Sequence, residues 1–145
     1  MSLADKVVVA RPPVHGLSRS KALAASGFGI VAWLIAALFI RYGLPAGLLS
    51  GWNRVIVFIL TPALTWGALT LVRRGASPPP ADELAAVISI ATAAAAFCDV
   101  AAMTWAPGLY AETPADVLSG AILILWGVAW ALALSIAGQI KRRGA

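Results

Sequence analysis

Four long apolar stretches separated by short polar ones dominate the chain. They cover residues 22–40, 55–72, 84–105 and 116–140. A helix needs about 20 residues, at about 1.5 Å of rise each, to cross the hydrocarbon core of a bilayer. The pattern therefore predicts an all-α membrane protein, a four-transmembrane-helix bundle in which successive helices run antiparallel, up and down.

The polar stretches carry start and stop signals for helices. Prolines at 78–80, with Asp82 and Glu83 close behind, predict the start of the third helix, and the Pro107-Gly108 pair predicts its end. The segment 113–116, Thr-Pro-Ala-Asp, resembles a capping box with proline at the first helical position, and it predicts the start of the fourth helix.

Basic residues gather on one side of the predicted membrane. With four crossings, the basic residues before the first span share a side with residues 73–74 and 141–143, whereas the other side has only Arg41 and Arg54. Because positively charged loops stay on the cytoplasmic side, this asymmetry predicts that both termini are cytoplasmic.

The chain accordingly divides into an N-terminal cytoplasmic arm (1–21), a transmembrane domain (22–140) and a basic cytoplasmic tail (141–145). The first apolar stretch is preceded by a long leader with Pro12-Pro13 and exceeds the usual h-region of about 7–15 residues. We therefore expect the leader to be retained rather than cleaved as a signal peptide.

Composition narrows the functional classes. The chain is 61% hydrophobic and 12% charged, against about 25% charged residues in soluble domains. Its net charge of +5 does not indicate nucleic-acid binding, because the basic residues sit at the ends of apolar stretches, where membrane lipids meet them. Cys98 and His15 are the only residues of their types, which excludes an intrachain disulfide and a bis-histidine haem within one chain. We expect no cofactor.

Asp99 is the one acidic residue inside an apolar stretch, where a carboxylate costs about 2.5–3.5 kcal/mol on insertion scales. The short loop between the second and third predicted helices favours their packing as neighbours, which would bring Arg54 to Asp99. Arg41 is a further candidate partner for this carboxylate. The residues of this predicted intramembrane polar seam are Asp99, Arg54, Arg41, Thr61, Thr65, Thr92 and Ser89. An ion pair between Asp99 and an arginine could serve only to fix the register of the two helices. A carboxylate used for proton coupling or ligand binding, an unpaired protonated Asp99, and a contact with another chain remain alternatives.

Aromatic and small residues add two expectations. Trp126 and Trp130, four residues apart on one helix face, could line a groove for a quinone, a carotenoid or a lipid chain, or could simply pack against small residues. Spacings such as Ala25 with Gly29 predict close helix contacts. The residues expected to form an aromatic belt at the outer interface are Tyr42, Trp52, Trp105 and Tyr110.

The segment from Asp99 to Tyr110 reads DVAAMTWAPGLY, and residues 125–130 read LWGVAW. This C-terminal half resembles a family of small uncharacterised four-span bacterial integral membrane proteins, in which an aspartate precedes a W-x-P-x-L-Y turn. The resemblance implies four spans and carries no activity. We expect the protein in the bacterial inner membrane, crossing it several times.

Three functions remain in competition. The leading interpretation is a non-catalytic membrane protein, an accessory or structural subunit of a larger complex or a homo-oligomer, because the sequence has no nucleophile paired with a base, no metal cluster and no phosphate loop. One alternative is a small oligomeric transporter or channel that uses Asp99. The other is a carrier or binder of a lipophilic ligand.

Overall fold

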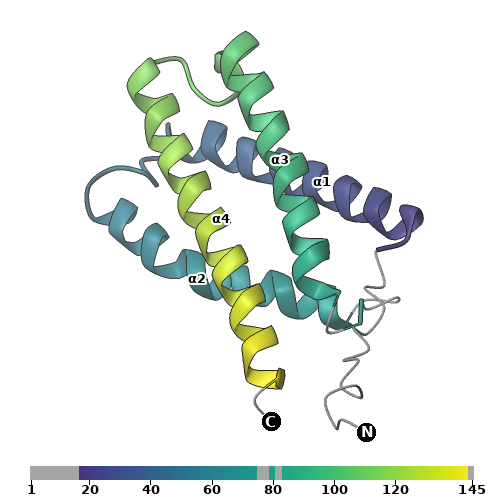
Figure 1. The fold of residues 1–145 in the computed structure, drawn as a ribbon. Helices are drawn as coiled ribbons and strands as arrows, with labels where there is room; N and C mark the ends of the chain where they lie inside the picture. The colour runs from purple at the N-terminus through teal and green to yellow at the C-terminus, as the bar shows by residue number, and fades with distance from the viewer. Residues whose placement is uncertain (1–16, 75–78, 81–82, 144–145) are drawn as a thin grey trace, which may run out of the picture.

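A computed structural model describes residues 17–74, 79–80 and 83–143. Its elements are α1 (Arg19–Gly43), α2 (Gly51–Arg74), α3 (Leu84–Trp105), the short 3-10 helix η2 (Pro107–Leu109) and α4 (Pro114–Arg143) (Figure 1). The predicted all-α fold with four long helices is confirmed.

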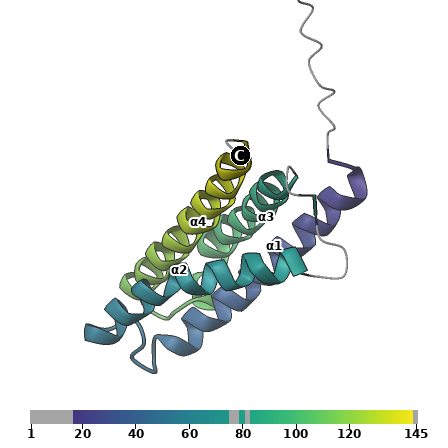
Figure 2. The same ribbon diagram turned by 90° about the horizontal axis from the view of Figure 1, so that it is seen from below.

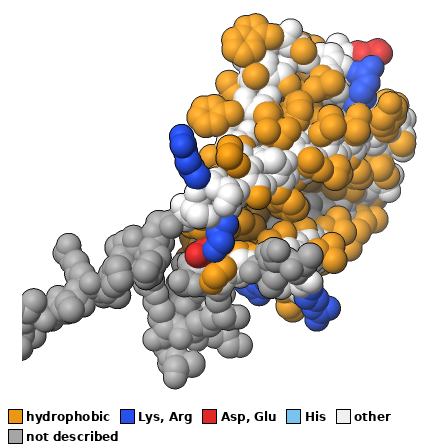
Figure 3. Space-filling view, turned by 90° about the vertical axis from the view of Figure 1, so that its right-hand side faces the viewer, with side chains coloured by type: hydrophobic (Ala, Val, Ile, Leu, Met, Phe, Trp, Pro, Cys, Tyr) orange, Lys and Arg blue, Asp and Glu red, His pale blue; other side chains and the backbone are white. Residues whose placement is uncertain are grey.

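All four helices are long and apolar enough to cross a membrane, with mean hydropathies of 2.0–2.3 over their most apolar windows. Many large apolar side chains face outward, among them Leu64 on α2 and Phe97 on α3, which are 72% and 78% exposed. Figure 3 shows hydrophobic side chains over most of one face, with charged side chains near its margins. Such a surface suits lipid rather than water, and with the four apolar helices it fits a multi-pass membrane protein.

The helix ends follow the local signals closely. The Ser18 side chain caps α1 by accepting from the Lys21 amide at 3.4 Å, and the Thr113 side chain accepts from the Asp116 amide at 3.2 Å, as the capping pattern predicts. Helix α3 has the predicted bounds, whereas the other three helices exceed their predicted spans: α2 begins at Gly51 and α4 continues to Arg143. The predicted arm 1–21 lies mostly outside the described residues.

Helix α1 packs along α3. The Lys21 ammonium and the Glu83 carboxylate lie 2.6 Å apart, which joins the beginnings of the two helices. Midway along, the helices approach so closely that a Cβ added at Gly29 would lie 2.1 Å from the carbonyl oxygen of Ala91. Gly29 is therefore a genuine close-contact position, as the small-residue spacing with Ala25 predicts.

Helix α2 packs on α4 instead of α3. Helices α3 and α4 lie side by side, with α1 and α2 on the same side of that pair (Figures 1 and 2). Contact between α2 and α3 includes the cluster of Leu69, Leu84 and Ile88 at one end. The prediction that the second and third helices pack as neighbours is wrong beyond that end, because α3 packs along α1 and α4 while α2 packs along α4.

Candidate functional site

Three polar side chains meet inside the helix bundle around Asp99. The Tyr110 hydroxyl donates to Asp99 Oδ1, and the indole nitrogen of Trp33 donates to the Tyr110 oxygen at 2.7 Å. Asp99 is 9% exposed and Tyr110 is 0% exposed. The intramembrane carboxylate thus has a neutral hydrogen-bonding partner, which in turn has a partner of its own.

The turn after α3 brings Tyr110 back to Asp99. The helix closes with a bond from the Ala106 amide to the Ala102 carbonyl at 2.8 Å. Helix η2 then folds the chain back, with the Tyr110 amide donating to the Pro107 carbonyl at 3.0 Å. Proline suits this position because its ring ends the preceding helix and presets the turn. The side chain of Tyr110 consequently points inward rather than along the membrane surface.

Trp33 reaches the same point from α1. Counted from the Lys21–Glu83 bridge, Trp33 lies about 18 Å along α1 and Asp99 about 24 Å along α3, at 1.5 Å per residue. The Tyr110 hydroxyl lies between the two groups, because it accepts from the Trp33 indole nitrogen and donates to Asp99 Oδ1. Because α1 and α3 begin at the same end of the bundle, the three groups meet past the middle of both helices.

Apolar packing closes the site. Tyr110 shares a buried cluster with Ala37, Ile40 and Ala102, and a Cβ added at Gly120 of α4 would lie 2.7 Å from Ile40 Cγ2. Burial, and after it the hydrogen bond to Asp99, raise the pKa of the Tyr110 hydroxyl above its ordinary value. Tyr110 therefore stays a protonated donor at physiological pH.

The structure does not bring Arg54 to Asp99. The Arg54 guanidinium lies 5.7 Å from the centre of the Phe58 ring on its own helix, and within the described part of the chain the one ion pair is Lys21–Glu83. The expected pairing fails because α2 faces α4. Arg41, the alternative partner, donates to the Gly108 carbonyl instead.

The predicted polar seam is likewise dispersed. The Thr61 and Thr65 hydroxyls each donate to the carbonyl four residues earlier in α2, both at 2.8 Å, so they serve their own helix. On α3, Thr92 is half-buried and Ser89 is exposed. Of the seam residues, Asp99 alone takes part in the buried polar chain.

Trp126 hydrogen-bonds to a backbone carbonyl of α2. Pro62 has no amide hydrogen, so the Phe58 carbonyl, four residues earlier, lacks its usual helical donor. The Trp126 indole nitrogen of α4 donates to that carbonyl at 3.0 Å, while the Trp126 ring stacks on Phe58 with centroids 6.2 Å apart. Trp126 therefore joins α4 to α2 at the proline.

Trp130 completes this aromatic group edge-on, with its ring centroid 5.7 Å from that of Trp126. Its indole nitrogen is buried without a hydrogen-bond partner among the described residues. The groove for a lipophilic ligand at Trp126 and Trp130 stays a prediction, since the contacts described for these two side chains are all with other residues of the chain.

Sequence reasoning missed two members of the polar chain. It assigned Tyr110 to the aromatic belt, which is wrong because the side chain has no exposed surface. It gave Trp33 no hydrogen-bonding role. The usable signal was the Pro107-Gly108 turn, which returns the chain toward α3, together with the need of a buried tyrosine hydroxyl for a partner.

Comparison with known proteins adds no relative. No protein-family model, no curated protein and no solved structure matches the chain.

Proposed function

We propose that this chain is a non-catalytic integral membrane protein that serves as a structural or accessory subunit of a larger membrane assembly. The observation that carries the proposal is the state of Asp99. Its carboxylate accepts from Tyr110, which is fully buried and is itself held by Trp33. The Asp99 side chain, bonded in this way, stabilises the contact between α1, α3 and the η2 turn.

The surface of α2 supports the same proposal. Leu69 is the one residue of this 24-residue helix that is buried within the chain. Large side chains such as Trp66 and Leu64 are 63% and 72% exposed. A helix that buries so little against its own bundle has a broad face available for lipids and for partner helices.

We further propose an antiparallel bundle with both termini in the cytoplasm, in a bacterial inner membrane. Lys21 and Glu83 lie at one end of the bundle. Arg73 reaches the neighbourhood of Gly138 near the end of α4, where a Cβ on that glycine would lie 2.9 Å from Arg73 Nη2. This grouping agrees with the positive-inside rule. The resemblance of the C-terminal half to four-span bacterial proteins favours the same membrane.

Native purification tests the subunit proposal. The tagged chain is extracted from its own membrane in mild detergent, and every component of the resulting particle is identified by mass spectrometry. We expect stoichiometric protein partners, or several copies of this chain. A particle that contains one copy and no partner would contradict the proposal, and a co-purified quinone or carotenoid would favour a ligand carrier.

A second candidate is an oligomeric transporter or channel that uses Asp99. One observation favours it: within the described residues, Asp99 accepts from the neutral Tyr110 hydroxyl and forms no ion pair. Its charge is therefore available for a proton or a cationic substrate.

Two variants separate the candidates. A transporter predicts that Asp99→Asn abolishes proton-driven uptake into liposomes while the chain remains folded. A structural joint predicts instead that Asp99→Asn and Tyr110→Phe both lower thermal stability, since each weakens the same buried chain.

A further inference from the structure

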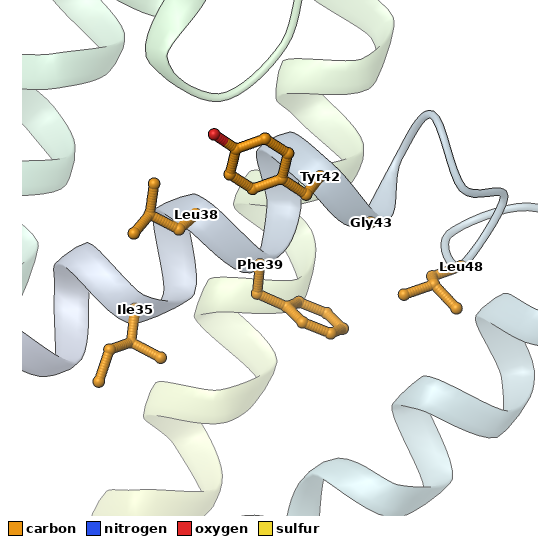
Figure 4. A pocket seen from close by; sticks show the side chains of 6 residues that line it. All are labelled: Ile35, Leu38, Phe39, Tyr42, Gly43 and Leu48. Carbon is orange, nitrogen blue, oxygen red and sulfur yellow. The ribbon is translucent and has the colours of Figure 1, made fainter.

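An apolar groove lies at the end of α1. Its six lining residues are Ile35, Leu38, Phe39, Tyr42, Gly43 and Leu48. Figure 4 shows Leu48, on the loop that follows α1, and Phe39 pointing toward one another across the groove. The lining side chains of α1 remain exposed, with Ile35 at 64% and Tyr42 at 69%.

The loop wall of this groove is built by hydrogen bonds. The Leu48 amide donates to the Gly43 carbonyl at 2.9 Å, which folds the loop back onto the helix end. Gly47 adopts a φ of 75°. Its carbonyl accepts from the Ser50 hydroxyl at 3.0 Å and from the side-chain amide nitrogen of Asn53 at 3.1 Å. The position of Leu48 is therefore set by the backbone before any ligand arrives.

Arg41 provides a positive charge on the same helical turn, three residues after Leu38 and directly before Tyr42. Its Nη1 donates to the Gly108 carbonyl, which holds the guanidinium in place, and the side chain is exposed. Within the described residues no carboxylate pairs with it. A guanidinium has five N–H donors, so most of them are available to bind an anion such as a phosphate.

We propose that this end of α1 binds an anionic phospholipid, with an acyl chain in the groove and the phosphate on Arg41. The groove runs from Ile35 to Tyr42, about 10 Å at 1.5 Å per residue, and it suits part of an acyl chain. Tyr42 and Arg41 lie at the helix end, where headgroups are found. The combination of an apolar wall and an unneutralised cation matches a lipid with a net negative headgroup better than a zwitterionic lipid or an apolar helix of a second copy.

The headgroup part is tested in nanodiscs of phosphatidylglycerol and phosphatidylcholine in equal amounts. After transfer to detergent, native mass spectrometry counts each lipid retained per chain. Wild type is expected to retain phosphatidylglycerol preferentially, and Arg41→Gln to lose that preference by about tenfold, as for the loss of one charged hydrogen bond. Arg41→Lys keeps the charge and should keep part of the preference. The matched control is Arg54→Gln, which removes an arginine placed over Phe58.

The acyl part is tested by filling the groove. Leu38→Trp should reduce retention of both lipids, whereas Leu64→Trp, on an exposed face of α2, should not. Circular dichroism melts confirm that each variant is folded. Equal losses in Arg41→Gln and Arg54→Gln would mean general surface charge, and unchanged retention in Leu38→Trp would mean that the groove is not used. Absence of any preference in wild type, or a change of oligomeric state in Leu38→Trp, would also overturn the proposal.

Discussion

The bond between Trp126 and the Phe58 carbonyl can be tested through the proline that creates the need for it. Trp126→Phe removes the donor but keeps an aromatic ring beside Phe58. The freed carbonyl then lies in an apolar environment without a partner. Interhelical hydrogen bonds in membranes contribute about 0.6–2 kcal/mol, and leaving a buried acceptor unsatisfied costs about 1–3 kcal/mol. We therefore expect a loss of about 1–2 kcal/mol in the free energy of unfolding.

Pro62→Ala supplies the missing amide hydrogen from within α2. In that background the Phe58 carbonyl has a helical donor, so Trp126→Phe should cost only the loss of ring packing. The double-mutant cycle should show a coupling of about 1 kcal/mol between the two positions. The packing loss appears in both backgrounds and cancels.

The assay is unfolding in mixed micelles by increasing denaturing detergent, followed by circular dichroism. Trp66→Phe is the matched control, because that tryptophan is on α2, the helix that carries Phe58 and Pro62, and is 63% exposed; it should change stability by less than about 0.5 kcal/mol. Equal costs of Trp126→Phe in the proline and alanine backgrounds would refute the reasoning.

Three further outcomes follow from the packing. Tyr110→Phe should cost about 1–3 kcal/mol in detergent unfolding, because it leaves the buried Asp99 side chain without its hydrogen-bond donor; wild-type stability would contradict this. Gly29→Ala should destabilise by about 1–3 kcal/mol because its Cβ meets backbone, whereas Gly27→Ala, with nothing within 4 Å, should not. Lys21→Met removes the ion pair to Glu83 at an end of the bundle, where Lys21 is 45% exposed. Its cost in thermal melts should stay under about 1 kcal/mol and shrink in salt; a larger, salt-independent cost would contradict this.

Local sequence patterns were sufficient to predict the four helices. Apolar length predicts the four helices, and the proline and threonine signals around 78–80 and 113–116 place the starts of α3 and α4 correctly. These features depend on neighbours in sequence, such as the capping of Asp116 by Thr113, so no knowledge of the packing is needed to find them.

The site required contacts that sequence spacing does not encode. The position of a residue along a helix can be counted from the sequence, and this count places Asp99 inside the apolar span 84–105. Compared by position alone, Arg54 was the nearest basic residue and therefore the expected partner. Which residues meet depends on the rotation of each helix about its own axis. That rotation is set by the faces on which two helices can approach most closely.

By itself the sequence determined the number of helices, their lengths and the unusual burial of one carboxylate, because these follow from hydropathy and local capping. Tertiary structure alone decided that α1 covers α3, that α2 covers α4, and that Asp99 is held by Tyr110 and Trp33. The physical reason is that both contacts join residues far apart in the sequence: Gly29 admits α1 to the backbone of α3, and Trp126 donates to the carbonyl that Pro62 leaves without a helical donor in α2.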